Sequence, residues 1–279
     1  MSLQTANTEL STTPPVLRVL ARPRTIALAC IAVLVAAGWA YLGLVLAGQT
    51  SQGILSALCQ PLYGLAGSSG IAGLFVTFAM WCAMVLAMML PTAAPMVTTY
   101  ADLAETAAAK GEPAASPLVL TAGYLAVWLT AAIALSALQA GLAYVGALGG
   151  VTSVVNPVVA GALFLIAGLY QFSNLKQACV TQCQHPFRFF LSNWTAEPRR
   201  VFRLGVRQGL YCLGCCWAMM LLMFAVGVMS VVWMAALGAV MAVEKLGTPA
   251  RLNRAIGIVW LTIGATIIGG QVLTYWKAG

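Results

Sequence analysis

Residues 211–223 read Tyr-Cys-Leu-Gly-Cys-Cys-Trp-Ala-Met-Met-Leu-Leu-Met, a stretch with no charged residue and six sulfur-containing side chains. On an α-helix, successive side chains are about 100° apart, so all six sulfurs fall within an arc of about 140°. The stretch therefore predicts an apolar helix that carries one stripe of thiols and thioethers. The sulfur residues are Cys212, Cys215, Cys216, Met219, Met220 and Met223.

The rest of the chain is also apolar. Of its 279 residues, 61% are hydrophobic and only 7% are charged, whereas about 25% of residues are charged in a soluble domain. Several apolar runs reach the ~20 residues that a helix needs to cross a hydrocarbon core. The composition predicts an all-α, polytopic membrane helix bundle in a lipid bilayer. The net charge of +8 does not indicate a nucleic-acid partner, because in a membrane protein the placement of charge matters more than its sum.

We expect about seven transmembrane helices. The fifth and sixth share residues 210–246, which we expect to form a tight hairpin that turns near 227–230, with a re-entrant pair as the alternative. Pro91 and Pro95 are expected to end or bend the second span, because proline lacks the backbone N–H. The predicted spans are 26–47, the run from 71 to the prolines, 118–140, 158–172, the hairpin, and 255–276.

The basic residues predict the orientation of these spans. With the N-terminus in the cytoplasm, every Lys and Arg except Lys277 falls on the cytoplasmic side, as the positive-inside rule requires. Residues 1–25 are then a disordered, basic cytoplasmic tail. Residues 26–279 form a single transmembrane domain with a cytoplasmic loop at 173–207. The expected location is the bacterial inner membrane.

A second cysteine run, residues 179–185, reads Cys-Val-Thr-Gln-Cys-Gln-His. The predicted topology places it, with the start of the fifth span, at the reducing cytoplasmic face, so we expect thiols and not disulfides. Cys179 and Cys183 have i, i+4 spacing, and Cys212, Cys215 and Cys216 have i, i+3, i+4 spacing, as metal ligands on a helix do. Thiolates select copper(I), zinc or iron–sulfur clusters.

His185 is a candidate ligand because it follows Cys183 by two residues, with an ordinary loop residue as the alternative. Cys30 and Cys82 stand alone in their spans and are interpreted as packing residues. Glu244, next to Lys245 at the end of a span, is expected to be solvated.

Methionines extend the sulfur stripe. Met80, Met84 and Met88 recur every four residues in the second span, and Met219 and Met223 continue the cysteine stripe inward. Neutral thioethers bind copper(I) without adding charge to a hydrocarbon environment, which favours copper(I), with zinc as the second choice. The alternative for these methionines is ordinary core packing.

Short motifs lie along much of the chain. They are Met80-Trp with Met84, Met88-Met-Leu-Pro91, Ala94-Pro-Met96, Gly168-Leu-Tyr-Gln, Leu175-Lys-Gln-Ala-Cys179 with Cys183, Arg203-Leu-Gly, Gly209-Leu-Tyr-Cys-Leu-Gly-Cys-Cys-Trp217 and Glu244-Lys245. Over residues 71–276 this set resembles a family of bacterial integral membrane proteins that is predicted to bind metal and sometimes labelled copper chaperone. The resemblance implies a membrane location and metal binding at Cys179, Cys183, Cys212, Cys215 and Cys216.

We therefore interpret the chain as a metal-binding membrane protein. It would accept copper(I) at a cytoplasmic thiol site and hold it or pass it inward along the methionines, with a metal-donor protein or a cuproenzyme as partner. Two alternatives remain: a thiol-redox module that uses Cys212 and Cys215 as a Cys-x-x-Cys pair, and a non-catalytic membrane subunit with structural zinc. No catalytic or organic-cofactor motif is recognisable, so we do not expect an enzyme.

Overall fold

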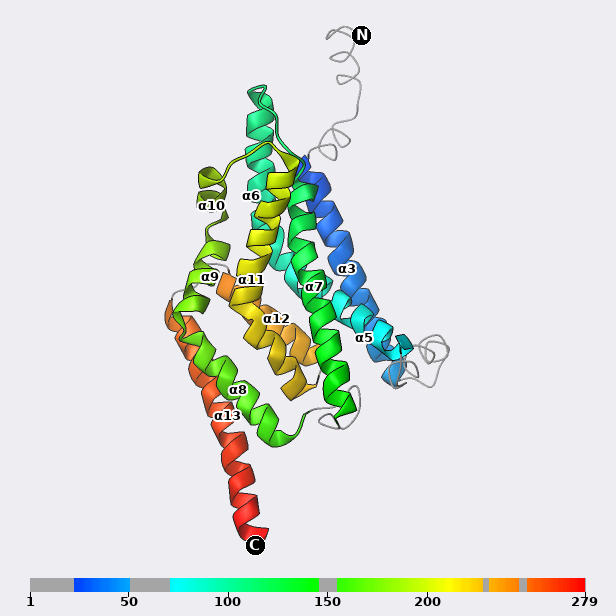
Figure 1. Cartoon of the computed structure of the whole chain (residues 1–279), viewed down its shortest axis with the longest axis vertical. Coiled ribbons are helices and arrows are strands. Elements are labelled where there is room, and N and C mark those ends of the chain that lie inside the picture. The colour runs from blue at the N-terminus through cyan, green and yellow to red at the C-terminus, as the bar shows by residue number, and fades with distance from the viewer. Residues whose placement is uncertain (1–22, 51–70, 146–154, 228–230, 246–249, 279) are drawn as a thin grey trace.

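The chain folds almost entirely into helices (Figure 1). The structure, a computed structural model, describes residues 23–50, 71–145, 155–227, 231–245 and 250–278, and these ranges contain no strand. The helices are α3 (Pro23–Thr50), α5 (Ile71–Met84), the π-helical turn η1 (Val85–Met89), α6 (Leu90–Ala109), α7 (Pro117–Tyr144), α8 (Pro157–Gln171), α9 (Asn174–Gln184), α10 (Pro186–Ser192), α11 (Pro198–Val226), α12 (Val231–Lys245) and α13 (Ala250–Ala278). Most of the predicted tail, up to residue 22, lies outside the described residues.

A helix covers each stretch that was predicted to span the membrane, but not every helix is long enough to do so. α8 and α9 together would form one further span if their 66° bend is accepted within it. α12 has 15 residues, fewer than the roughly 20 that a full crossing takes. Seven spans therefore stay a prediction, as does the side of the N-terminus. Within the described ranges, five helical stretches are long and apolar enough to cross a membrane: Arg24–Leu44, Gly73–Ala109, Pro117–Tyr144, Pro198–Val226 and Arg251–Trp276.

Large apolar side chains cover the outside of the bundle. Val33, Phe75 and Leu273 are 66%, 70% and 64% exposed. An apolar exterior of this kind is unfavourable in water, because exposed hydrocarbon has to be hydrated. The exterior is consistent with a lipid bilayer around the helices.

The segment predicted to be a cytoplasmic loop between spans, residues 173–207, is largely helical. It contains α9, α10 and the first turns of α11. Ser173 caps α9 by accepting a hydrogen bond from the backbone N–H of Lys176, and Pro186 and Pro198 lie in the first turns of α10 and α11. Both are typical helix starts. These helices bury one apolar face and leave their arginines exposed, and the cytoplasmic location of the segment stays a prediction.

The second span contains the π-helical turn η1 directly before Pro91. The helix does not end at Pro91 or Pro95 but continues as α6. Proline cannot donate a hydrogen bond to the carbonyl four residues earlier, which for Pro91 is that of Ala87; Trp39 Nε1 donates to this oxygen over 3.1 Å. A π turn widens the helix locally, so the residues in and after it are rotated away from the positions of a regular α-helix.

Helix α11 lies in the middle of the bundle, with α7 on one side and α8 and α9 on the other (Figure 1). α7 and α11 pack closely because glycines line their contact. A Cβ built on Gly205 would lie 2.1 Å from the carbonyl oxygen of Leu120, and one built on Gly123 would lie 2.2 Å from that of Phe202. Small residues commonly allow apolar helices to approach in this way. The contact fixes the position of α11, which carries residues 211–223.

Substitution of Gly205 by alanine should destabilise the bundle, because the added methyl group meets rigid backbone. We expect a loss of about 1–3 kcal/mol, measured as a lower thermal unfolding temperature of the detergent-purified protein. Gly141, on the neighbouring helix α7, has nothing within 4 Å of a built Cβ, so Gly141→Ala is the matched control. Equal unfolding temperatures for the two variants would contradict the packing described.

Candidate metal centre

Three thiols meet on one face of α11. Cys212, Cys215 and Cys216 have the spacing that places side chains together on a helix, and their Sγ atoms all lie within 4.8 Å of one another. All three are buried, with at most 4% of their surface exposed. The thiols of Cys215 and Cys216 both donate to the carbonyl oxygen of Cys212, over 3.0 and 2.9 Å. We refer to these three residues as the thiol triad; they could hold a metal ion.

The thiol triad lies about halfway along α11. The sequence placed Cys212 near the start of a span, but α11 already begins at Pro198. At 1.5 Å per residue, the helix rises about 21 Å between these two residues. The first half of α11 carries the arginines, and the second half is the apolar part that the sequence identified.

Lys245, at the end of α12, brings a positive charge to the thiol triad. Its Nζ lies 2.9 Å from Cys212 Sγ and 2.9 Å from Thr92 Oγ1. The hydroxyl of Tyr124 lies 3.0 Å from the same sulfur. Buried thiolates need a compensating charge, and an ammonium in direct contact supplies one. Sequence reasoning missed Lys245 and Tyr124 as parts of the site; the signal was the charged pair Glu244-Lys245 at the end of an apolar helix.

Helix α9 adds two further thiols. The thiol of Cys183 lies within hydrogen-bonding reach of the Cys215 thiol. Cys179 Sγ lies against Gly214, where a Cβ would come within 2.8 Å of the sulfur, so the missing side chain allows α9 to approach α11. The structure thus brings together the five cysteines that were predicted as ligands, which come from two helices: Cys179, Cys183, Cys212, Cys215 and Cys216.

One thioether lies directly beside the thiol triad. Met89 Sδ is 3.9 Å from Cys216 Sγ, and the carbonyl oxygen of Met89 accepts a hydrogen bond from the Tyr124 hydroxyl over 3.0 Å. Met89 ends the π turn η1. The sequence missed it because regular four-residue spacing selects Met80, Met84 and Met88, whereas the π turn changes which methionine faces α11.

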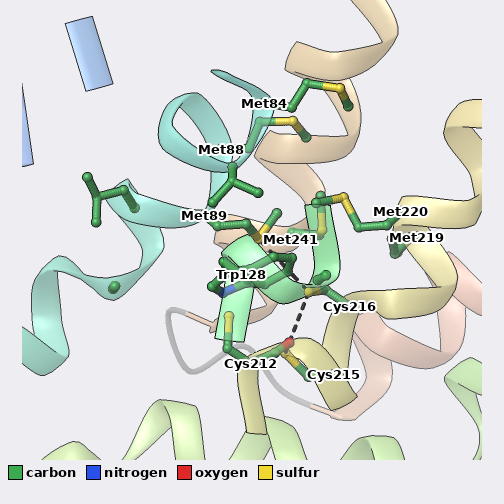
Figure 2. Close-up of a cluster of buried hydrophobic side chains, with 14 of the residues drawn as sticks. Met84, Met88, Met89, Trp128, Cys212, Cys215, Cys216, Met219, Met220 and Met241 are labelled. Carbon is green, nitrogen blue, oxygen red and sulfur yellow. Dashed lines mark hydrogen bonds between the residues drawn. The ribbon is translucent and has the colours of Figure 1, made fainter. Parts of the chain in front are cut away.

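The other predicted methionines lie in the buried core with the thiols. Figure 2 shows Met84, Met88 and Met89 in succession on the side of Cys216 that lies away from Cys212. Met241 of α12, which the sequence did not select, joins this group. Each of the methionines predicted as a ligand has at most 5% of its surface exposed: Met80, Met84, Met88, Met219 and Met223.

His185 does not join the cysteines. It lies between α9 and α10, and its exposed side chain lines an outer cleft with Arg188 and Arg207. Among the described residues, the close group of potential metal-ligating atoms contains the thiol triad and no histidine. The two-residue distance from Cys183 does not bring the imidazole to the thiols, because α9 ends between them.

Glu244 is buried, which corrects the expectation that it is solvated. Only 2% of its surface is exposed, and its carboxylate accepts hydrogen bonds from Lys176 Nζ over 2.9 and 3.1 Å. Gln171 Nε2 donates to the same carboxylate, and Gln184 Nε2 donates to the Glu244 carbonyl oxygen over 2.7 Å. The pair is buried because α9 packs over the end of α12. It holds the thiols of α9 beside those of α11.

The fold and the site define a class of protein: a helical bundle with several helices of membrane-spanning length around a buried group of thiols that could bind metal. Residues 78–267 match the family PpoB2, described as copper chaperone. Since this match covers more than half of the chain, the chain belongs to that family, and the resemblance inferred from the motifs is confirmed. No curated protein and no solved structure matches the chain.

Glu244→Ala should destabilise the protein by about 3–5 kcal/mol, because it leaves the Lys176 ammonium buried without its partner. Thermal unfolding in detergent measures this loss. The double variant Lys176→Met/Glu244→Leu removes both charges and should recover most of it. The control is Glu197→Ala, which breaks an exposed pair with Arg200 and should change little. A double variant as unstable as Glu244→Ala would contradict this account.

Proposed function

We propose that this chain is an integral membrane protein that binds copper(I) as its cargo at the thiol triad. The observation that carries the proposal is the buried group of three thiols within 4.8 Å, with a thioether 3.9 Å from one of them. Thiol and thioether sulfurs are soft donors and select copper(I) among the common metals. The family description, copper chaperone, supports the same metal.

The surroundings of the triad suit a monovalent metal. Two or three thiolates with one copper(I) carry a net negative charge, which is costly among apolar side chains. Lys245 lies in contact with Cys212 and offsets one unit of that charge. Tyr124 supplies a hydroxyl at the same sulfur, so the site stabilises bound thiolate without water.

Cys183 is the proposed first acceptor of the metal. It is only half-buried, whereas the triad is closed to solvent, and its thiol reaches Cys215. Copper(I) exchanges readily between like sulfur donors, so it passes from Cys183 to the triad. Met89 and the methionines beyond it then offer uncharged thioether donors deeper in the bundle, through which copper(I) passes toward a membrane cuproenzyme as acceptor.

The proposed orientation puts the basic end of the bundle in the bacterial cytoplasm. Arg24 pairs with Asp102 across α3 and α6, and the starts of α7 and α11 lie at the same end of the bundle (Figure 1). The positive-inside rule assigns this end to the cytoplasm, where cysteines stay reduced. Seven spans in the inner membrane are part of this proposal.

Structural zinc is the second candidate. Cys183 and the thiol triad together provide four sulfurs, which is the number that tetrahedral zinc takes. The thioether of Met89 beside Cys216 favours copper(I), because zinc prefers anionic or nitrogen ligands. A thiol-redox role is less well supported, since disulfide exchange needs an accessible thiol and Cys212 and Cys215 are 4% and 3% exposed.

Protein purified from cells grown with both copper and zinc should contain about one copper(I) per chain by element analysis, in line with one triad. Cys215→Ser and Cys216→Ser should each lower the copper content at least ~10-fold, since two thiolates hold the ion less tightly than three. The control is Cys30→Ser, which changes an exposed thiol on α3. Zinc in place of copper, or a Cys212–Cys215 disulfide without metal, would overturn the proposal.

Met89→Leu should weaken copper(I) binding about 10-fold while it preserves the fold, because leucine matches the volume of methionine and lacks the sulfur. Competition with a copper(I) chelator of known affinity measures the effect. Met96→Leu is the control, since Met96 is also buried and lies on the continuation of the same helix. An unchanged copper(I) affinity in Met89→Leu would show that the Met89 thioether is not a ligand.

A further inference from the structure

A polar cleft of about 470 Å³ opens where α9, α10 and α11 meet. Its volume is that of a site for a small molecule. Neither the thiol triad nor the methionines contribute to it. Its polar lining includes Gln182, His185, Arg188, Ser192, Arg207 and Tyr211.

The cleft is positively charged. In the part of the chain that the structure describes, the ion pairs join Arg24 to Asp102, Lys176 to Glu244 and Arg200 to Glu197, so neither arginine of the cleft has a carboxylate partner. Arg207 is held in place by Asn193 Oδ1, 3.2 Å from its Nη1, and by the ring of Phe189, 5.4 Å away. Fixed guanidinium groups bind carboxylates with high geometric selectivity.

Two residues of the cleft lining directly precede cysteines of the proposed copper site. Gln182 directly precedes Cys183 on α9, and Tyr211 directly precedes Cys212 on α11. No cysteine of the described ranges lines the cleft itself, but these two lining residues are next in sequence to cysteines of the proposed copper site. This adjacency distinguishes the cleft from other arginine-rich parts of the surface.

We propose that this cleft binds a small, carboxylate-bearing thiol that delivers copper(I) to Cys183. The inference rests on the proposed copper(I) function and names the class of donor. Arg188 and Arg207 bind the carboxylates, and the donor's sulfur lies toward Cys183. In the transfer, the bond between copper and the donor sulfur breaks and a bond to Cys183 Sγ forms. The Cys183 proton moves to the departing donor sulfur, and copper stays in the +1 state.

S-methylglutathione tests the cleft apart from copper, because it keeps both carboxylates and its blocked sulfur cannot deliver metal. We expect full-length protein in phosphatidylcholine nanodiscs to bind it by calorimetry. Arg188→Gln should weaken this binding about 10-fold, the effect of losing one charged hydrogen bond. Arg199→Gln is the matched control, since Arg199 is exposed on α11 outside the cleft. Lack of binding, or equal weakening by Arg199→Gln, overturns the inference.

A second experiment follows the rate of copper(I) loading by stopped flow. From the copper(I)–glutathione complex, Arg188→Gln should load about 10-fold more slowly than the unaltered protein. From the copper(I)–acetonitrile complex, which has no carboxylate, the two should load alike. Equal slowing from both donors overturns the inference and leaves the proposed copper site intact. Failure to load from either donor refutes the proposed function, while the calorimetry still decides whether the cleft binds the anion.

Anionic lipid is the competing occupant of the cleft. Nanodiscs that contain phosphatidylglycerol place a phosphate next to the same arginines. S-methylglutathione should bind these nanodiscs with nearly unchanged affinity if the cleft serves a soluble donor. Complete loss of binding there would assign the cleft to a lipid headgroup and overturn the inference.

Discussion

The contact between the Lys245 ammonium and the Cys212 thiol, 2.9 Å apart, is the interaction on which the rest of the site depends. It joins α12 to α11, and the same ammonium reaches α6 through Thr92. The adjacent Glu244 joins α12 to α9 through Lys176. Two consecutive residues at the end of α12 therefore connect the two helices that carry the candidate cysteine ligands, α9 and α11, and also reach α6. Charges buried in an apolar bundle require partners, so the helices are constrained to meet at this point.

The π turn before Pro91 brings a thioether, that of Met89, to the thiols. A regular helix through this region would have to leave one carbonyl without a donor at the proline, and it would keep Met80, Met84 and Met88 in one stripe. The widened turn places Met89 against Cys216, while Trp39 and Tyr124 satisfy the carbonyls of Ala87 and Met89. π turns are frequent at functional sites, and here the irregularity changes the ligand set.

The sequence predicted an all-helical bundle and selected five cysteines that the structure places on two packed helices, because long apolar runs and i, i+4 spacing are local signals. It did not predict contacts that depend on tertiary packing. Glu244 was predicted to be a solvated end residue, whereas α9 packs over it, and regular four-residue spacing does not select Met89. His185 is close to Cys183 in sequence but does not lie with the thiols in the structure, because α9 ends between the two residues. The helices of the polar segment 173–207 bury only one face, so their apolar residues form no long run that the sequence could reveal.

The order of donors along the bundle follows from charge. The thiols lie where Lys245 can neutralise the charge that they gain on deprotonation, and deeper in the core the sulfurs belong to methionines, which carry no charge. Copper(I) among thioethers alone would remain a bare positive charge in an apolar medium, which is unfavourable. At the triad, the positive charge of copper(I) is balanced by thiolates, and the remaining negative charge is balanced by the Lys245 ammonium. In the proposed function the thiol triad is therefore the stable binding site, and the metal occupies the methionines beyond Met89 only briefly. Release along that path requires an acceptor whose own donors are anionic.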